Sequence, residues 1–159
     1  MPDLIALMGI PASGKSTHIE QMKLDYFARG ENVEVVSPDQ IRLQLTGDMS
    51  NQDRNSEVFM TAHALAGMYL RQDKTVIWDA TNVTARARRD ILKTAAEANA
   101  LAKLVVIDTP LTTARQRNAA RDRVVPEHVL DRMYRQFVES LSQIGHELWF
   151  SIEKKPCLG

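Results

Sequence analysis

The sequence predicts an α/β fold built on a doubly wound parallel sheet of four to five strands. Two observations carry this prediction. Short apolar segments recur along the chain, and the first four are each followed by longer segments with the apolar spacing of helices. Strands that alternate with helices in this way form βαβ units, and ligands bind such sheets beyond the carboxyl ends of the strands. We therefore expect functional residues directly after each predicted strand.

Apolar and β-branched runs mark the strands. The predicted strands span residues 4–8, 33–36, 75–78 and 104–107, and residues 148–152 are predicted as a fifth, edge strand. Residues 154–159 are expected to form a loose end of the chain.

Segments with helical periodicity separate the strands, and a glycine or a proline lies near several of their ends. They are residues 16–28, 37–45, 54–72, 84–100, 112–122 and 126–141. In the longest of these helices Phe59 belongs to the apolar stripe, and Met60 and Met68 are predicted to be core residues.

Length and composition predict one domain, residues 1–159. Lys plus Arg and Asp plus Glu are both 20, so no global positive charge marks a nucleic-acid binder, although a local patch suffices for a short end. Cys157 is the single cysteine, which fits a reducing compartment, and no apolar run approaches the ~18 residues of a membrane span. With no basic leader at the N-terminus, these features predict a cytoplasmic protein with no membrane contact.

The first strand leads into Gly9-Ile10-Pro11-Ala12-Ser13-Gly14-Lys15-Ser16-Thr17, which matches the phosphate-binding loop pattern G-x-x-x-x-G-K-[ST]. Gly9 and Gly14 permit a tight curl of backbone N–H groups, and the helix that follows favours anions at its N-terminus. Lys15 is predicted to reach the β- and γ-phosphates, and the Ser16 hydroxyl is predicted to bind Mg²⁺. The predicted nucleotide-binding residues of this loop are Gly9, Ala12, Ser13, Gly14, Lys15, Ser16 and Thr17.

This loop predicts a P-loop NTPase-type fold that uses ATP, or another nucleoside triphosphate, and Mg²⁺. The loop alone does not distinguish a kinase from a nucleotide-hydrolysing switch or motor. A chain of 159 residues without inserted domains favours a kinase, and no guanine-reading Asn-Lys-x-Asp sequence is present.

Two strand ends carry carboxylates suited to kinase chemistry. Asp39 and Arg42 follow the second strand at a spacing that places them on one helix face, where they could orient the acceptor hydroxyl and hold an anionic acceptor. Asp39 could equally be a first-turn acid at a helix start. Asp79 ends the third strand, where an acid can hold Mg²⁺ indirectly or simply end the strand.

Arginines follow the third and fourth strands. Arg86, Arg88 and Arg89 lie at a helix start, where they indicate either an anionic partner or a solvated charged face. Arg117 and Arg121 lie four residues apart on one face of a predicted lid helix and could stabilise charge on a transferring phosphoryl group. A solvated helix of mixed charge is the alternative for this pair.

Together these segments resemble the phage-type polynucleotide 5′-hydroxyl kinases. The resemblance spans about residues 4–141 and rests on the phosphate-binding loop, on Asp39-Gln40-Ile41-Arg42, on Asp79-Ala80-Thr81-Asn82, and on Arg117-Asn118-Ala119-Ala120-Arg121 with Val125-Pro126 and residues 129–134. The last stretch is the most specific, because it is peculiar to this kinase group.

The resemblance implies a role for each matching residue. Lys15 and Ser16 would hold the ATP phosphates and Mg²⁺, and Asp39 would be the general base toward the 5′-hydroxyl. Arg42 would bind the phosphate on the 3′ side of the terminal nucleoside. The remaining implied residues are Asp79 and Thr81 on the acceptor side, Arg117 and Arg121 as lid arginines on the ATP phosphates, and Val125 with Pro126 near the acceptor.

The sequence also departs from this family. No Asp-x-Asp-x-Thr motif of a 3′-phosphatase domain is present, so end healing would need separate phosphatase and ligase partners. The family's Asp-Thr-Asn is here Asp79-Ala80-Thr81-Asn82, one residue longer, which leaves the parts of Thr81 and Asn82 open.

Three functions follow from these residues. The first is an ATP-dependent kinase acting on the 5′-hydroxyl end of DNA or RNA. The second is a P-loop kinase of a nucleotide sugar or small metabolite, which would need a closed polar acceptor pocket instead of an open mouth. The third is a nucleotide-binding module without transfer, which would need neither Asp39 nor the lid arginines. The preferred nucleic acid and the oligomeric state stay open.

Overall fold

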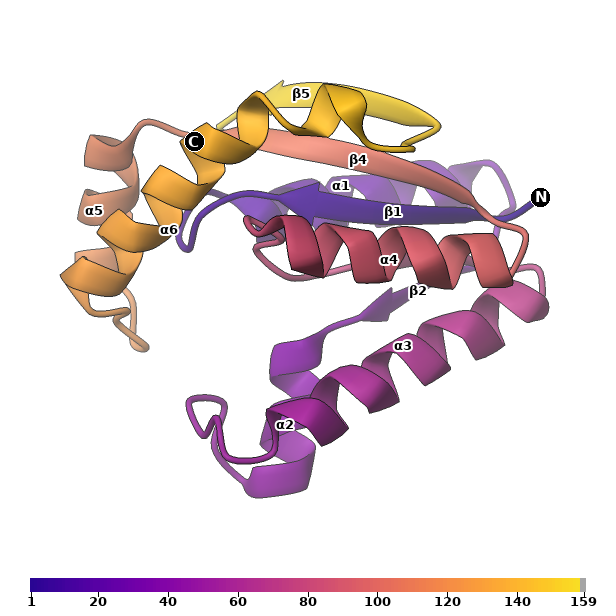
Figure 1. Ribbon diagram of the computed structural model, residues 1–159, viewed down its shortest axis with the longest axis horizontal. Helices are drawn as coiled ribbons and strands as arrows, with labels where there is room; N and C mark the ends of the chain where they lie inside the picture. The colour runs from indigo at the N-terminus through magenta and orange to yellow at the C-terminus, as the bar shows by residue number, and fades with distance from the viewer. Residues whose placement is uncertain (158–159) are drawn as a thin grey trace.

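A computed structural model describes residues 1–157, whose strands form one parallel sheet in the order β2-β3-β1-β4-β5 (Figure 1). The strands are β1 (Asp3–Met8), β2 (Val33–Val36), β3 (Thr75–Trp78), β4 (Leu101–Asp108) and β5 (Ser151–Pro156). The helices are α1 (Lys15–Ala28), α2 (Pro38–Thr46), α3 (Asn55–Arg71), α4 (Ala85–Glu97), α5 (Leu111–Ala119) and α6 (Glu127–Leu141), with a 3₁₀ turn η1 (Ile144–His146). The predicted α/β fold with a parallel sheet is confirmed.

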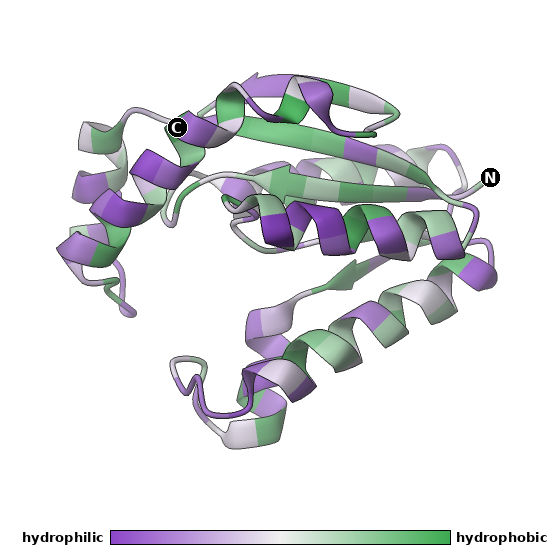
Figure 2. Ribbon diagram, in the orientation of Figure 1, coloured by the Kyte–Doolittle hydropathy of each residue, from purple (hydrophilic) through white to green (hydrophobic). Residues whose placement is uncertain are grey.

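The two faces of the sheet bury different helices because side chains alternate along each strand. Leu4 and Met8 of β1 face a large apolar cluster to which α3, α4 and α6 contribute. Ile5 and Leu7 face a smaller cluster whose helical members are Ile19 and Tyr26 of α1. Figure 2 shows the apolar strands between these helices. The sheet is therefore covered on both faces, as a parallel sheet requires.

The strand order places the start of the phosphate-binding loop at the middle of the sheet. β1 pairs with β3 on one side and with β4 on the other, so the chain leaves β1 toward one edge and later returns to build the opposite edge. A crevice outside the carboxyl ends of the strands forms where the order reverses in this way. Residues 9–14 follow β1 at this point.

The largest differences from the predicted strands are at the fourth and fifth. β4 starts at Leu101 instead of residue 104, because α4 ends at Glu97 and Asn99 takes a positive φ of 52° that ends the helical run. β5 spans Ser151–Pro156 instead of residues 148–152, and it pairs with β4 from Lys103 onward. The expectation of a loose end from residue 154 is therefore wrong for residues 154–156, and residues 158–159 lie outside the described part of the chain.

Some predicted core residues are exposed. Met60 is 68% exposed and Met68 is 44% exposed, and Phe59 retains 38% of its accessible surface. The buried face of α3 is formed instead by other, mostly smaller residues, which are Val58, Ala62, Ala66, Gly67 and Leu70. Fewer residues of α3 are therefore buried than its number of apolar residues suggests. Within residues 1–157, no helix has the length and apolar character needed to cross a bilayer.

Candidate functional site

The loop between β1 and α1 is curled tightly. Gly14 adopts φ 96° as the residue before α1, and Ala12 adopts φ 62°, a left-handed conformation that non-glycine residues rarely take. A Cβ on Gly9 would lie 2.8 Å from Ser13 Oγ and 3.2 Å from Ile107 Cβ. Gly9 and Gly14 therefore have the backbone roles that the sequence predicts for them.

Ser13 is fully buried inside this curl. Its Oγ has no hydrogen-bond partner within the described structure, while its carbonyl accepts a 2.8 Å hydrogen bond from Thr109 Oγ1, just beyond β4. An unpartnered buried hydroxyl is costly in a folded protein unless a ligand or solvent completes it. The loop thus encloses a polar hydroxyl that could still accept or donate a hydrogen bond.

The segment after β3 supports the same loop. Gly9 donates its N–H to the Thr81 carbonyl at 3.0 Å, and buried Asn82 donates from Nδ2 to the Leu7 carbonyl at 2.6 Å. The contacts that join Thr81 and Asn82 to the loop therefore hold the end of β1 in place. Thr81, predicted to contact the substrate, makes this loop contact through its backbone carbonyl, and Asn82 adopts a φ of 53°.

Lys15 lies over the loop. Its Nζ donates hydrogen bonds to the carbonyls of Gly9 and Ile10 at 3.0 and 2.8 Å. Burial lowers the pKa of Lys15 to about 8; Arg121 lowers it further, while Asp79 and Asp39 act to raise it. The structure therefore brings these four charged groups of the predicted site together.

Asp79 is half-buried directly beyond β3. Burial raises the pKa of its carboxyl above its ordinary value; Lys15 acts to lower it and Asp39 to raise it. Two carboxylates and one lysine thus share one electrostatic environment at the carboxyl edge of the sheet, and clusters of this kind are frequent in catalytic sites.

Asp39 and Arg42 form a direct pair in α2. Ser37 caps this helix by accepting from the Gln40 N–H at 3.3 Å, which places Asp39 in the first turn. Arg42 Nη1 donates to Asp39 Oδ1 at 2.5 Å, and its Nε and Nη2 donate to Asn55 Oδ1 at 3.2 and 3.0 Å.

The two members of this pair differ in exposure. The Arg42 side chain is 5% exposed, whereas the Asp39 side chain is 53% exposed. A fixed, buried cation therefore holds one oxygen of a carboxylate that remains open to solvent. Sequence reasoning missed Asn55, the residue that fixes Arg42, because nothing in the sequence marks the first residue of α3 as its partner.

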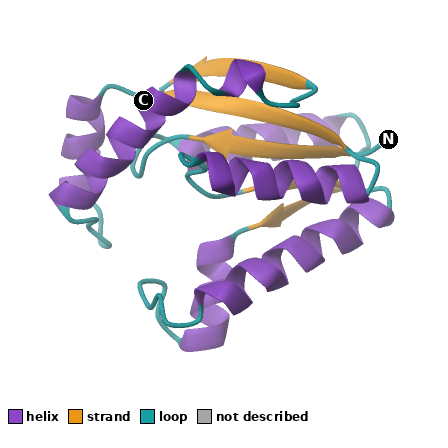
Figure 3. Cartoon of the chain, in the orientation of Figure 1, coloured by secondary structure: helices purple, strands orange, loops and turns teal. Residues whose placement is uncertain are grey.

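Helices α5 and α6 and residues 120–126 between them form the predicted lid (Figure 3). Buried Asn118 closes its turn, because Nδ2 donates to the Val125 carbonyl at 2.7 Å and Oδ1 accepts from the Val125 N–H at 3.0 Å. Arg115 of α5 pairs with Asp131 of α6 at 2.7 Å. The backbone of Val125, predicted to lie near the acceptor, is therefore held in a defined position.

The lid arginines take different positions. Arg121 follows α5 and influences the charge of Lys15, as expected for a residue near the phosphate-binding loop. Arg117 lies in the last turn of α5. Arg123, to which the sequence assigned no separate role, lies 3.5 Å from Asp39 Oδ2 through Nη1 and donates from Nη2 to the Met49 carbonyl at 3.4 Å. The lid thus reaches across the site to the carboxylate of α2.

Arg88 is fully buried and belongs to neither of the alternatives that the sequence left open for it. It donates to the Glu147 carboxylate at 3.0 Å, to Ser140 Oγ at 2.8 Å and to the Asn82 carbonyl at 3.1 Å. This network joins α4, the end of α6 and the segment after β3. Because Asn82 in turn holds the end of β1, Arg88 supports the phosphate-binding loop from behind.

The residues present fit a nucleotide with Mg²⁺. Ser16 is exposed in the first turn of α1, where helical N–H groups have no intrahelical acceptor. Within residues 1–157 no group of three His, Cys, Asp or Glu side chains could hold a metal by itself. A Mg²⁺ ion would therefore depend on Ser16, on the nucleotide phosphates and indirectly on Asp79, as in P-loop enzymes generally.

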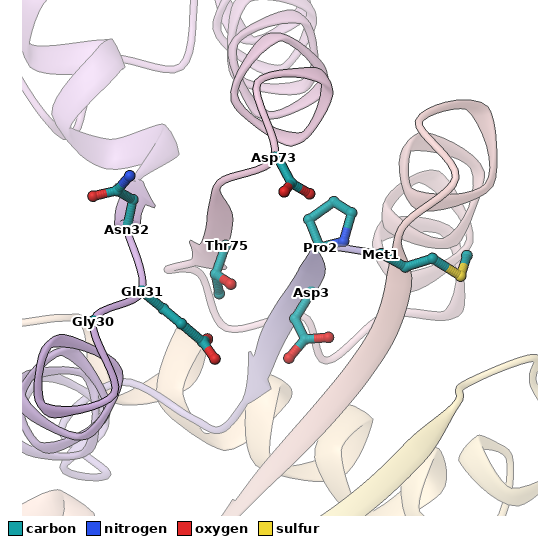
Figure 4. A pocket seen from close by; sticks show the side chains of 8 residues that line it. All are labelled: Met1, Pro2, Asp3, Gly30, Glu31, Asn32, Asp73 and Thr75. Carbon is teal, nitrogen blue, oxygen red and sulfur yellow. The ribbon is translucent and has the colours of Figure 1, made fainter.

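A hollow of about 400 Å³ lies at the opposite, amino edge of the sheet and is lined in part by the carboxylates of Asp3, Glu31 and Asp73 (Figure 4). Asp3 already pairs with Lys103 at 2.8 Å and accepts from the Tyr26 hydroxyl at 2.9 Å. This hollow contains none of the predicted site residues.

Known proteins with similar sequences include kinases. A family model described as AAA domain matches residues 4–140. The L-seryl-tRNA(Sec) kinase of Methanococcus maripaludis is 26% identical over 137 residues, which are 84% of this chain and 52% of that protein. The chain thus spans about half the length of this curated relative.

Solved structures extend the comparison. A chain in the structure of the Pnkp1/Rnl/Hen1 RNA repair complex is 28% identical with a TM-score of 0.76, over 89% of this chain and 46% of that chain. A chain of the PezAT chromosomal toxin–antitoxin system of Streptococcus pneumoniae has a TM-score of 0.75 over 98% of this chain and 68% of that chain. At 16% identity the second likeness shows the fold alone.

Proposed function

The chain belongs to the AAA-domain family, and we propose that it is an ATP-dependent kinase of polynucleotide 5′-hydroxyl ends. One observation carries the proposal. The Asp39 carboxylate, held by the buried Arg42 guanidinium, shares its electrostatic surroundings with Lys15, Asp79 and Arg121. This combination supports the proposal, because Asp39 would act as the proton acceptor and Arg42 as the anion-binding cation beside a phosphate-binding loop.

In the proposed reaction the 5′-hydroxyl oxygen attacks the γ-phosphorus of ATP, and the bond from that phosphorus to the β–γ bridging oxygen breaks. The hydroxyl proton passes to Asp39, and the products are ADP and a 5′-phosphorylated end. Asp39 suits the base role because Arg42 holds one of its oxygens while the side chain stays 53% exposed. Such transfer depends on positioning and charge.

The donor side of the proposed site uses the loop and the lid. Lys15 would carry its charge to the β- and γ-phosphates, and Arg117 and Arg121 would contact the same phosphates from the lid. Mg²⁺ bound with the nucleotide would neutralise charge that develops during transfer. Lys15 in particular is suited to this role, because an ammonium held only by two loop carbonyls can exchange them for phosphate oxygens.

The acceptor side favours a chain end over an enclosed metabolite. Asp39 is open to solvent, while Arg42 is fixed by Asn55 and cannot follow a moving ligand. A fixed cation beside an open carboxylate suits an acceptor whose phosphate lies at a set distance from its attacking hydroxyl. The first nucleotide of a strand has this spacing between its 5′-hydroxyl and its 3′ phosphate. The proposed acceptor residues are Asp39, Arg42, Asp79, Thr81 and Val125.

A second candidate is transfer to another hydroxyl. The relative named L-seryl-tRNA(Sec) kinase supports this alternative, because its name gives L-seryl-tRNA(Sec) as the acceptor. If the first proposal holds, phosphatase and ligase activities would complete end repair.

The experiment is an acceptor panel with radiolabelled γ-phosphate of ATP and Mg²⁺. It compares 5′-hydroxyl DNA and RNA oligonucleotides, seryl-tRNA, and a set of nucleotide sugars and metabolites. We expect label on one or both oligonucleotides, lost in Lys15→Ala and retained in Met60→Ala, an exposed position on α3. Label on seryl-tRNA or a small acceptor alone would overturn the proposal in favour of the second candidate.

A further inference from the structure

A second hollow, of about 310 Å³, lies between α3 and α4 beside the proposed acceptor site. Its lining includes Asn55, Phe59, His63, Trp78, Arg86 and Asp90. Pockets that hold small organic groups begin near this size and combine apolar or aromatic surface with a few polar groups. Nothing in the proposed transfer uses this pocket.

Residues that line the pocket contact or adjoin residues of the proposed acceptor side. Asn55, which lines the pocket, accepts both hydrogen bonds from Arg42 Nε and Nη2. Trp78 and Asn82, which also line it, lie on either side of Asp79 in the chain. The contact of Asn55 with Arg42 therefore makes this pocket a candidate site for the nucleotide that follows a phosphate bound at Arg42.

Aromatic rings form one wall of the pocket. The His63 imidazole stacks on Trp78, with ring centroids 4.4 Å apart, and its Nδ1 lies 2.8 Å from Thr94 Oγ1. Burial lowers the pKa of His63, against smaller opposing effects of Asp90 and Glu97, which favours the neutral form of the ring. Phe59 keeps 38% of its surface exposed although its helix has a buried face available. These rings present a planar, uncharged surface.

A cation stands at the edge of the same pocket. Arg86 is exposed and, within residues 1–157, makes no hydrogen bond or ion pair with another side chain or with the backbone. An arginine beside aromatic rings is the combination by which proteins hold single-stranded nucleic acid, because bases stack on the rings and the guanidinium meets a phosphate.

We propose that the pocket between α3 and α4 binds the second nucleotide of a single-stranded acceptor, with its base against Phe59 and His63 and its phosphate near Arg86. The inference rests on the proposed 5′-kinase function and deepens it. It assigns this surface a role in distinguishing a strand from a single nucleotide.

The test measures KM and kcat for two acceptors that differ only beyond the first phosphate. One is a single-stranded 5′-hydroxyl oligothymidylate or oligouridylate, and the other is the matching nucleoside 3′-monophosphate. The variants are Phe59→Ala and Arg86→Ala, with Met60→Ala as the matched control on α3. Because a stacked base or a phosphate contact contributes through binding, we expect KM for the oligonucleotide to rise about tenfold in each pocket variant. KM for the monophosphate, KM for ATP and kcat should stay as in the unmodified protein.

Each outcome has a defined meaning. Equal KM changes on both acceptors would overturn the inference, because the pocket would then act on the first nucleotide or on the fold. No change on either acceptor would also overturn it, while the 5′-kinase function would stand on the activity of the unmodified protein. Failure of the unmodified protein to phosphorylate either acceptor would reject the proposed function, and the inference with it.

Discussion

At the scale of single residues, Asp39 is the most consequential assignment. Its oxygens face Arg42 at 2.5 Å and Arg123 at 3.5 Å, so a neutral amide of the same shape should leave α2 in place. We expect Asp39→Asn to lower kcat by about 10²- to 10⁴-fold, the usual contribution of a general base. Nucleotide affinity, measured by calorimetry, should change little. A large loss of ATP affinity with turnover retained would remove Asp39 from the base role.

Lys15 gives a pH-dependent prediction. Its pKa of about 8 in the free protein should rise when phosphates surround it, because negative charge favours the ammonium form. Protonated Lys15 therefore binds the nucleotide better, so affinity is full below pH 8 and falls as the pH rises through that value. Just above pH 8 binding should take up a proton.

Calorimetry in two buffers of different ionisation enthalpy measures that proton directly. Lys15→Arg is the matched variant, because arginine stays charged throughout this range and should bind without proton uptake. Proton uptake of the same size in Lys15→Arg would assign the titration to a group other than Lys15.

At the scale of elements, we expect the contact of Arg123 with Asp39 to compete with binding of the acceptor hydroxyl. Arg123 approaches the Asp39 oxygen that Arg42 leaves open, and in the proposed reaction an incoming hydroxyl would have to displace it. We expect Arg123→Ala to lower KM for the acceptor by at most about fivefold, because exposed ion pairs are weak. KM for ATP should not change.

The control for that variant is Arg115→Ala, which breaks the contact of α5 with Asp131 and leaves Asp39 untouched. Steady-state kinetics of both variants separate the two roles of the lid. A rise of acceptor KM in Arg123→Ala alone would show that Arg123 binds the acceptor instead of competing with it.

The buried Arg88 network gives a prediction about stability. Removing the guanidinium would take the hydrogen bonds that Arg88 donates away from Glu147, Ser140 and the Asn82 carbonyl, while Glu147 would keep its bond from Trp149 Nε1. We expect Arg88→Met to lower the free energy of unfolding by about 3–5 kcal/mol, the cost of breaking a buried ion pair. Urea denaturation measures this value, and exposed Arg89→Met on the same helix is the control. Equal effects of the two substitutions would contradict the network's role.

At the scale of the whole molecule, the sequence predicts the alternation of strands and helices well, because periodicity and glycine positions are local signals. The phosphate-binding loop was predictable for the same reason. The start of β4 and the position of β5 were not, since they depend on where α4 ends and on pairing between segments far apart in the chain.

Side-chain partners across the site were also beyond the sequence. In the sequence, Arg88 is one of several arginines in a charged helix. The packing of α6 and η1 against α4 buries it and lets it support the phosphate-binding loop through Asn82. Asn55 and Arg123 each approach the Asp39–Arg42 pair from another element. Such contacts are set by tertiary structure, which no local pattern encodes.

The most direct test of the central claim is transfer of labelled γ-phosphate from ATP to a 5′-hydroxyl oligonucleotide, run beside the same oligonucleotide already phosphorylated at its 5′ end. The account predicts label on the hydroxyl form only, removable by a phosphatase that acts on terminal phosphates. Label on neither form, from protein that binds ATP, would contradict the account and assign the site to another hydroxyl acceptor.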